Sequence, residues 1–127
     1  MLYRIVVSVF NFLDFLPFTG NIFRSFVAAE SVGIAGRALK LRDYKVAYKS
    51  LMKFENDSIE DVWVGSCQFM LGYLIYHGLA TDRDIDRAID VIQKSAWAGN
   101  GDAISYLKRR SKMQKAGYEV LDYSPRL

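Results

Sequence analysis

Helical spacing of apolar residues runs through almost the whole chain and limits the possible folds more than any other feature. From residue 22 to residue 116, apolar side chains recur three or four positions apart, and the strict alternation typical of β-strands is almost absent. An all-α fold is therefore expected. Breaks rich in Gly, Asn, Asp and Ser divide the pattern into predicted helices over residues 22–40, 43–54, 59–77, 84–98 and 102–116.

Capping signals set the ends of these helices. Ser58 is followed three residues later by Asp61, which approximates a capping box with Asp in place of the usual Glu or Gln. A helix is therefore expected to begin near Ile59. Gly78 and Gly117 are the expected stop signals for this helix and for the last one.

The chain has 127 residues, of which 51% are apolar and 24% charged, as expected for one folded domain. A chain of this length buries enough surface to fold without disulfides or metals. It contains one cysteine, Cys67, and one histidine, His77, too few for a structural zinc site of this chain's own Cys and His ligands. On one predicted helix these two residues would lie about 15 Å apart, too far for a catalytic dyad. No cofactor or metal is expected.

An acidic run precedes the predicted helix at residues 84–98. Asp82, Asp84 and Asp86 alternate as at the start of a calcium-binding loop, but Arg87 stands at the position that requires Gly and Gln93 at that of the terminal Glu. Helix capping by Asp84 explains the run better. The chain also lacks a glycine-rich phosphate-binding motif, so we expect a protein that is not an enzyme.

Residues 2–18 form an apolar segment interrupted by Arg4, Asn11 and Asp14. The polar positions fall at near-helical spacing, which predicts an amphipathic helix over residues 1–20 with a narrow polar stripe. The segment is too short and too polar for a simple membrane span, and its features do not favour a signal peptide. It can pack on its own domain, lie on a membrane surface or bind a partner. We expect a cytoplasmic protein, with membrane association through residues 2–18 as the alternative and export disfavoured.

Basic residues gather near the C-terminus, where residues 108–127 contain six basic and two acidic side chains. The pattern favours a solvated last helix whose cations stabilise the negative end of the helix dipole. Aromatic residues do not alternate with the cluster, so nucleic acid is not an expected partner. The cluster consists of Lys108, Arg109, Arg110, Lys112 and Lys115.

A series of small, apolar and charged residues in the second half of the chain has the order and spacing of a known repeat. It resembles the Sel-one-like repeat, a relative of the tetratricopeptide repeat, over residues 67–107. A degenerate copy precedes it, since Asp43, Ala47 and Lys53 stand 41 residues before Asp84, Ala88 and Lys94. The residues that carry the resemblance are Leu71, Gly72, Gly78, Asp84, Arg87, Ala88, Lys94, Ala96, Gly99, Ala103 and Leu107.

The resemblance implies antiparallel helix pairs stacked as a short α-solenoid of one to two repeats. Residues 1–20 would form an N-terminal capping helix, residues 21–117 the helical-repeat domain and residues 118–127 a C-terminal tail that also covers an open end. Small residues such as Gly72, Ala88 and Ala103 would allow close helix packing. The chain departs from the family at Ala80, which stands where the family has its second Gly, and at Ser95, which replaces the first Ala of a pair.

The resemblance also implies an adaptor that binds another protein, in bacteria often tied to signalling, to secretion or envelope processes, or to toxin neutralisation as an immunity protein. Residues 66–77 carry two stripes at helical spacing. The first contains Cys67, Met70, Leu71, Leu74 and Ile75 and is expected to be core. The second contains Phe69, Tyr73, Tyr76 and His77 and is the predicted partner-binding surface, because this helix lines the concave face by resemblance. The alternative is that the second stripe packs on a neighbouring helix.

Overall fold

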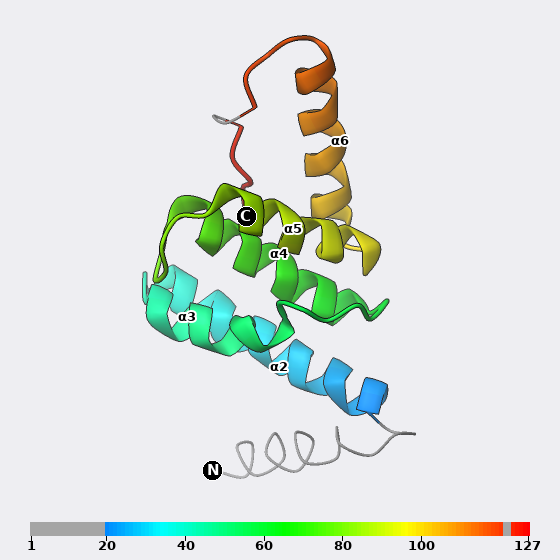
Figure 1. Ribbon diagram of the computed structural model, residues 1–127. Helices are drawn as coiled ribbons and strands as arrows, with labels where there is room; N and C mark the ends of the chain where they lie inside the picture. The colour runs from blue at the N-terminus through cyan, green and yellow to red at the C-terminus, as the bar shows by residue number, and fades with distance from the viewer. Residues whose placement is uncertain (1–19, 121–122) are drawn as a thin grey trace.

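The computed structural model describes residues 20–120 and 123–127. The predicted helix over residues 1–20 and its expected roles as a cap or membrane anchor therefore lie, apart from Gly20, outside the described residues. In the described part the regular structure is entirely helical, which confirms the all-α prediction (Figure 1). The helices are α2 (Gly20–Lys40), α3 (Tyr44–Leu51), the 3-10 helix η1 (Met52–Phe54), α4 (Val62–His77), α5 (Ile85–Trp97) and α6 (Gly101–Lys115).

Successive helices pack as stacked pairs (Figure 1). Helices α2 and α3 form the first pair, and α4 and α5 form the second, which lies against it through α4. Helix α6 packs on α5 and follows the second pair, and the end of the chain turns back beside it (Figure 1). The arrangement is a short α-solenoid in which α4 is the central helix.

In both pairs the second helix is capped by an aspartate, and the two aspartates stand at equivalent positions. Asp43 caps α3 by accepting a hydrogen bond from the amide of Val46 at 3.3 Å, and Asp84 caps α5 by accepting one from the amide of Arg87 at 3.0 Å. Four residues after each cap, Ala47 and Ala88 are fully buried. The 41-residue offset seen in the sequence thus relates positions with the same structural role, and Asp84 is a capping residue as predicted.

Helix α4 begins at Val62, three residues later than predicted. The cap is Asp61, whose carboxylate accepts hydrogen bonds from the amides of Trp63 at 2.9 Å and Val64 at 3.0 Å, so the expected capping box at Ser58 is wrong. The reason is a tertiary contact that holds the preceding connector in a non-helical path.

That contact comes from Gln68, a fully buried side chain of α4. Its amide nitrogen donates hydrogen bonds to the carbonyl oxygens of Phe54 at 3.0 Å and Asp57 at 2.8 Å. The connector of residues 55–61 is thereby fixed against α4. Only residues 98–100 separate α5 from α6, so the connector that precedes α4 is the longer of the two.

Gly78 ends α4 in the left-handed conformation with φ 66°, as expected for a helix stop signal. Two residues later Ala80 is also left-handed, with φ 65°. The chain therefore keeps, at the position where the resemblance expects glycine, a conformation that glycine adopts without steric cost.

The core forms two neighbouring clusters on either side of α4. Leu71, Leu74 and Cys67 belong to the larger cluster, which α4 shares with α2, α3 and part of α5. The smaller cluster joins α4, α5 and α6 through Phe69, Ile92, Ala103 and Tyr106. A helix that buries side chains on both sides is apolar around most of its circumference, which explains the two stripes of α4.

Close packing of the second pair requires Gly72. A Cβ atom at this position would lie 2.6 Å from Cγ1 of Ile92, well inside van der Waals contact. In α2 the buried small residues include Ala28 and Ala35 but neither Gly33 nor Gly36. Gly33 is exposed and Gly36 half-buried, and among the described residues no other element lies within 4 Å of a Cβ atom added at either.

A polar network links the end of the first pair to α5. The Arg87 guanidinium donates to both carboxylate oxygens of Glu55 and to the hydroxyl of Tyr48 at 2.9 Å. The hydrogen bonds and charge of Arg87 hold the pKa of Glu55 below its ordinary value of 4.5. Paired in this way, the carboxylate stabilises the folded chain in its ionised form.

Protonating Glu55 should therefore weaken the folded state. Because its pKa is lower in the folded than in the unfolded chain, the stabilisation is present above about pH 4.5 and is lost as the pH falls through the folded-state pKa. Because the ion pair is partly exposed, we expect this stabilisation to be about 1 kcal/mol. Urea unfolding of the wild type and Glu55→Gln at several pH values tests this expectation. If the difference in unfolding free energy between the wild type and Glu55→Gln stayed constant from pH 6 to pH 3, the expectation would be contradicted.

Cys67 is fully buried, and its thiol donates to the carbonyl oxygen of Ala28 across the interface of α2 and α4 at 3.3 Å. Burial raises the pKa of the thiol to about 12. Since thiolates react and thiols do not, labelling of the folded protein with a maleimide should be slow and limited by local opening. The single cysteine makes the measurement unambiguous. Labelling in native buffer as fast as in urea would show that this face of α4 is open.

Candidate partner-binding surface

The second stripe of α4 divides into two buried and two accessible residues. Phe69 is 4% exposed and Tyr76 is 1% exposed, so both are core residues in this structure. Tyr73 is half-buried and His77 is exposed. The predicted surface is therefore reduced to Tyr73 and His77, because neighbouring elements cover the other two side chains.

The neighbours of Phe69 and Tyr76 explain their burial. Phe69 packs in the cluster that joins α4 to α6, next to Tyr106. Tyr76 lies under the guanidinium of Arg83, whose carbon is 5.5 Å from the ring centroid and whose Nε also donates to the Tyr76 carbonyl at 3.0 Å. The alternative expected from the sequence, packing of the stripe on a neighbouring helix, holds for Phe69 against α6. Tyr76 belongs to the larger core cluster and is also covered by Arg83 of the loop before α5.

His77 connects the accessible part of the stripe to the end of the chain. Its ring lies 4.6 Å from that of Tyr73 and 5.5 Å from that of Tyr76. Its Nε2 lies 3.2 Å from the carbonyl oxygen of Pro125, a distance at which the protonated nitrogen donates a hydrogen bond. Pro125 itself is fully buried. The last turn of α4 thus contacts a segment that is 48 residues away in sequence.

Tyr106 of α6 makes the second contact with the C-terminal segment. Its hydroxyl donates to the carbonyl oxygen of Tyr123 at 2.7 Å, and the two rings stack with centroids 5.1 Å apart and an angle of 10°. Burial raises the pKa of Tyr106 to about 12, so the hydroxyl stays protonated and able to donate. The sequence analysis missed Tyr106. Its helical spacing from Ala103 was the available signal.

The C-terminal segment reaches this place because α6 ends in a reversal. Gly117 adopts φ 84°, and the amide of Tyr118 donates to the carbonyl of Met113 at 2.9 Å. The chain then returns toward α4 and α5 (Figure 1). We call the surface formed by α4, α6 and residues 123–126 the α4–α6 groove. A cavity of about 390 Å³ remains in it, lined by Phe69, Asp102, Ser105, Tyr106, Arg109, Tyr123, Ser124 and Arg126.

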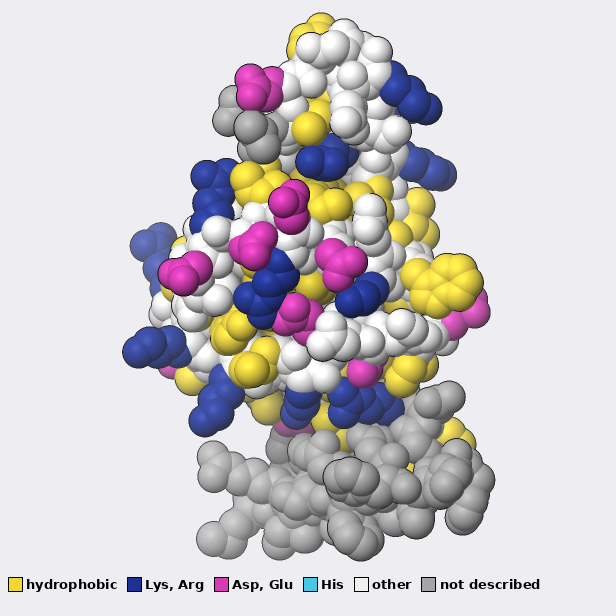
Figure 2. Space-filling view, in the orientation of Figure 1, with side chains coloured by type: hydrophobic (Ala, Val, Ile, Leu, Met, Phe, Trp, Pro, Cys, Tyr) yellow, Lys and Arg dark blue, Asp and Glu magenta, His cyan; other side chains and the backbone are white. Residues whose placement is uncertain are grey.

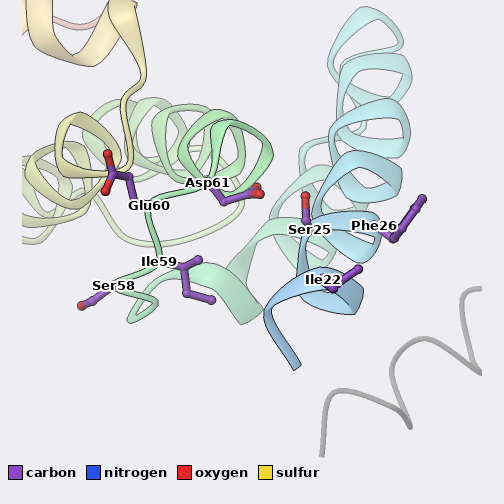
Figure 3. Close-up of a pocket in the computed structure, with 7 residues that line it drawn as sticks. All are labelled: Ile22, Ser25, Phe26, Ser58, Ile59, Glu60 and Asp61. Atoms are coloured by element: carbon purple, nitrogen blue, oxygen red, sulfur yellow. The ribbon is translucent and has the colours of Figure 1, made fainter. Parts of the chain in front are cut away.

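A second cleft of about 730 Å³ lies between the start of α2 and the connector that precedes α4 (Figure 3). Ile22, Ser25 and Phe26 come from α2, and residues 58–61 form the other side. The carboxylate of Asp61 is engaged in capping α4. The cleft combines exposed apolar side chains with a short acidic edge, and none of the described residues that line it form a hydrogen-bonded pair of nucleophile and base.

Charge is mixed on the face seen in Figure 2, where acidic and basic side chains alternate over the middle of the molecule. Within residues 20–120 and 123–127, no three His, Cys, Asp or Glu side chains gather as a metal site would require. No helix in this part of the chain has both the length and the apolar character needed to cross a membrane.

Comparison with known proteins gives no relative: no family model, no curated protein and no solved structure matches this chain.

Proposed function

We propose that this chain is a non-enzymatic interaction module of the helical-repeat type that binds an extended segment of another protein in the α4–α6 groove. One observation carries the proposal: side chains of α4 and α6 hold a stretch of polypeptide without regular secondary structure by its main-chain carbonyls. His77 contacts the carbonyl of Pro125, and Tyr106 donates to that of Tyr123. Such contacts bind the main chain of a peptide, and the stacking of Tyr123 on Tyr106 and the burial of Pro125 add contacts with its side chains.

The composition of the groove agrees with peptide binding. Tyr106 lines the cavity of the groove, and Tyr73 lies beside His77 on α4. Both combine a large apolar ring with a polar tip, the residue type that recurs at interaction hot spots. His77 faces the carbonyl oxygen of Pro125, an arrangement that suits peptide binding rather than activation of a nucleophile. The resemblance to the Sel-one-like repeat supports the same class of function. By that resemblance the partner is a toxin or a component of an envelope or secretion process.

The test is capture of the partner by the full-length chain from native extract, followed by binding measurements with single variants. Tyr73→Ala and His77→Ala should each weaken binding by about 1 to 2 kcal/mol, as hot-spot residues do. Circular dichroism and melting temperature report folding separately.

Trp97→Ala is the matched control, because Trp97 is an aromatic residue of α5 that is 69% exposed and lies in a separate surface depression with Asp90 and Gln93. It should leave binding unchanged. Loss of binding in this control, with full binding in the two folded groove variants, would place the partner elsewhere.

A further inference from the structure

The end of the chain lies on the groove as a bound peptide would. We propose that the α4–α6 groove selects segments in which an aromatic residue stands two positions before a proline, and that Tyr123–Pro125 of the chain itself is a displaceable occupant of this type. The inference rests on the proposed function and names the sequence pattern that the groove accepts.

Two anchors define this pattern. Tyr123 stacks on Tyr106 and offers its carbonyl oxygen to the same residue's hydroxyl. Pro125 is fully buried and offers its carbonyl oxygen to His77. Ser124 lies between them and lines the remaining cavity. Proline favours an extended backbone in the residue before it, which suits a segment held at both ends by main-chain carbonyls.

Within this segment Pro125 is the one fully buried residue, and Tyr123 and Ser124 are half-buried. Beyond Pro125, Arg126 and Leu127 are exposed, Leu127 at 62%. The residues that lead out of α6, from Lys115 to Glu119, are exposed as well. The segment also leaves part of the groove open, since the cavity beside it extends to Asp102 and Arg109. A longer partner segment has room for both the place of Tyr123–Pro125 and the open cavity beside it.

The attached segment should compete with any free peptide. An attached ligand has an effective concentration in the millimolar range, so it masks its own groove without binding tightly. Weakening the attached segment should therefore increase the affinity for a free copy of it.

The experiment compares two full-length chains, the wild type and Tyr123→Ala/Pro125→Ala, both checked by circular dichroism and melting. The probe is a fluorescent synthetic peptide with the sequence of residues 123–127, and binding is followed by fluorescence anisotropy. The dissociation constant should be at least tenfold lower for the variant than for the wild type. The matched control peptide carries Ala at the Tyr and Pro positions and should bind neither chain.

Equal affinity of the peptide for both chains, or no binding to the folded variant, would overturn the proposal. If the variant does not fold, the wild type decides: millimolar peptide should shift the His77 ring signals in NMR spectra and the control peptide should not. Absence of a shift overturns the proposal.

The outcome for the proposed function is separate. If the short peptide fails while partner binding still depends on Tyr73 and His77, the sequence pattern is wrong and the interaction module stands. If the peptide binds as expected but no captured partner depends on these residues, the segment is a self-ligand and the module proposal fails.

Discussion

Leu71→Ala and Ile92→Ala are each expected to lower the free energy of unfolding by about 2 to 5 kcal/mol. Both side chains are fully buried, Leu71 in the larger core cluster and Ile92 in the cluster that joins α4, α5 and α6. Truncation removes apolar contacts and leaves a cavity that rigid neighbouring helices fill only in part. Urea unfolding followed by circular dichroism measures the loss.

Leu41→Ala is the control for this experiment, because Leu41 is 81% exposed at the turn between α2 and α3. A change within about 0.5 kcal/mol is expected there. Wild-type melting temperatures for both core variants would show that the central helix does not pack as described.

The same substitution should have opposite effects at two helical glycines. Gly72→Ala should destabilise the chain by about 1 to 3 kcal/mol, because the added Cβ would meet Ile92 Cγ1 at 2.6 Å and force the pair apart. Gly36→Ala, in α2, has open space among the described residues and should stabilise by about 0.5 to 1 kcal/mol through helix propensity.

The double variant Gly72→Ala/Ile92→Ala identifies the cause. Removing Cγ1 of Ile92 removes the clash. The double variant should therefore lose less unfolding free energy than the two single variants lose together. Simple additivity, or a Gly72→Ala variant as stable as wild type, would mean that the helices of the second pair are not in the close contact described.

Local signals in the sequence predicted most of the helices. Asp84 and Gly78 act through hydrogen bonds and backbone angles within a few residues, so their roles follow from neighbouring positions alone. The start of α4 did not follow, because the donors that hold the connector come from Gln68, in the next helix. Periodicity cannot show such a contact.

The candidate surface was predicted only in part for a related reason. Spacing places Phe69, Tyr73, Tyr76 and His77 on one side of a helix, but which of them reach solvent depends on where α6 and residues 123–125 pack. That placement depends on the chain reversal at Gly117 and on the stacking of Tyr106 with Tyr123. The two tyrosines are 17 positions apart, so helical spacing does not relate them.

The buried amide of Gln68 has a consequence for the shape of the whole solenoid. Residues 55–61 are the covalent joint between the two helix pairs, and in a stack of pairs the joint helps to set the pitch at which one pair follows another. Here two hydrogen bonds from Gln68 hold that joint to α4, beside the ion pairs of Glu55 with Arg87 and of Asp57 with Arg24. A substitution at Gln68 would therefore change the superhelical twist, and with it the curvature of the surface presented to a partner, even where every helix stays intact.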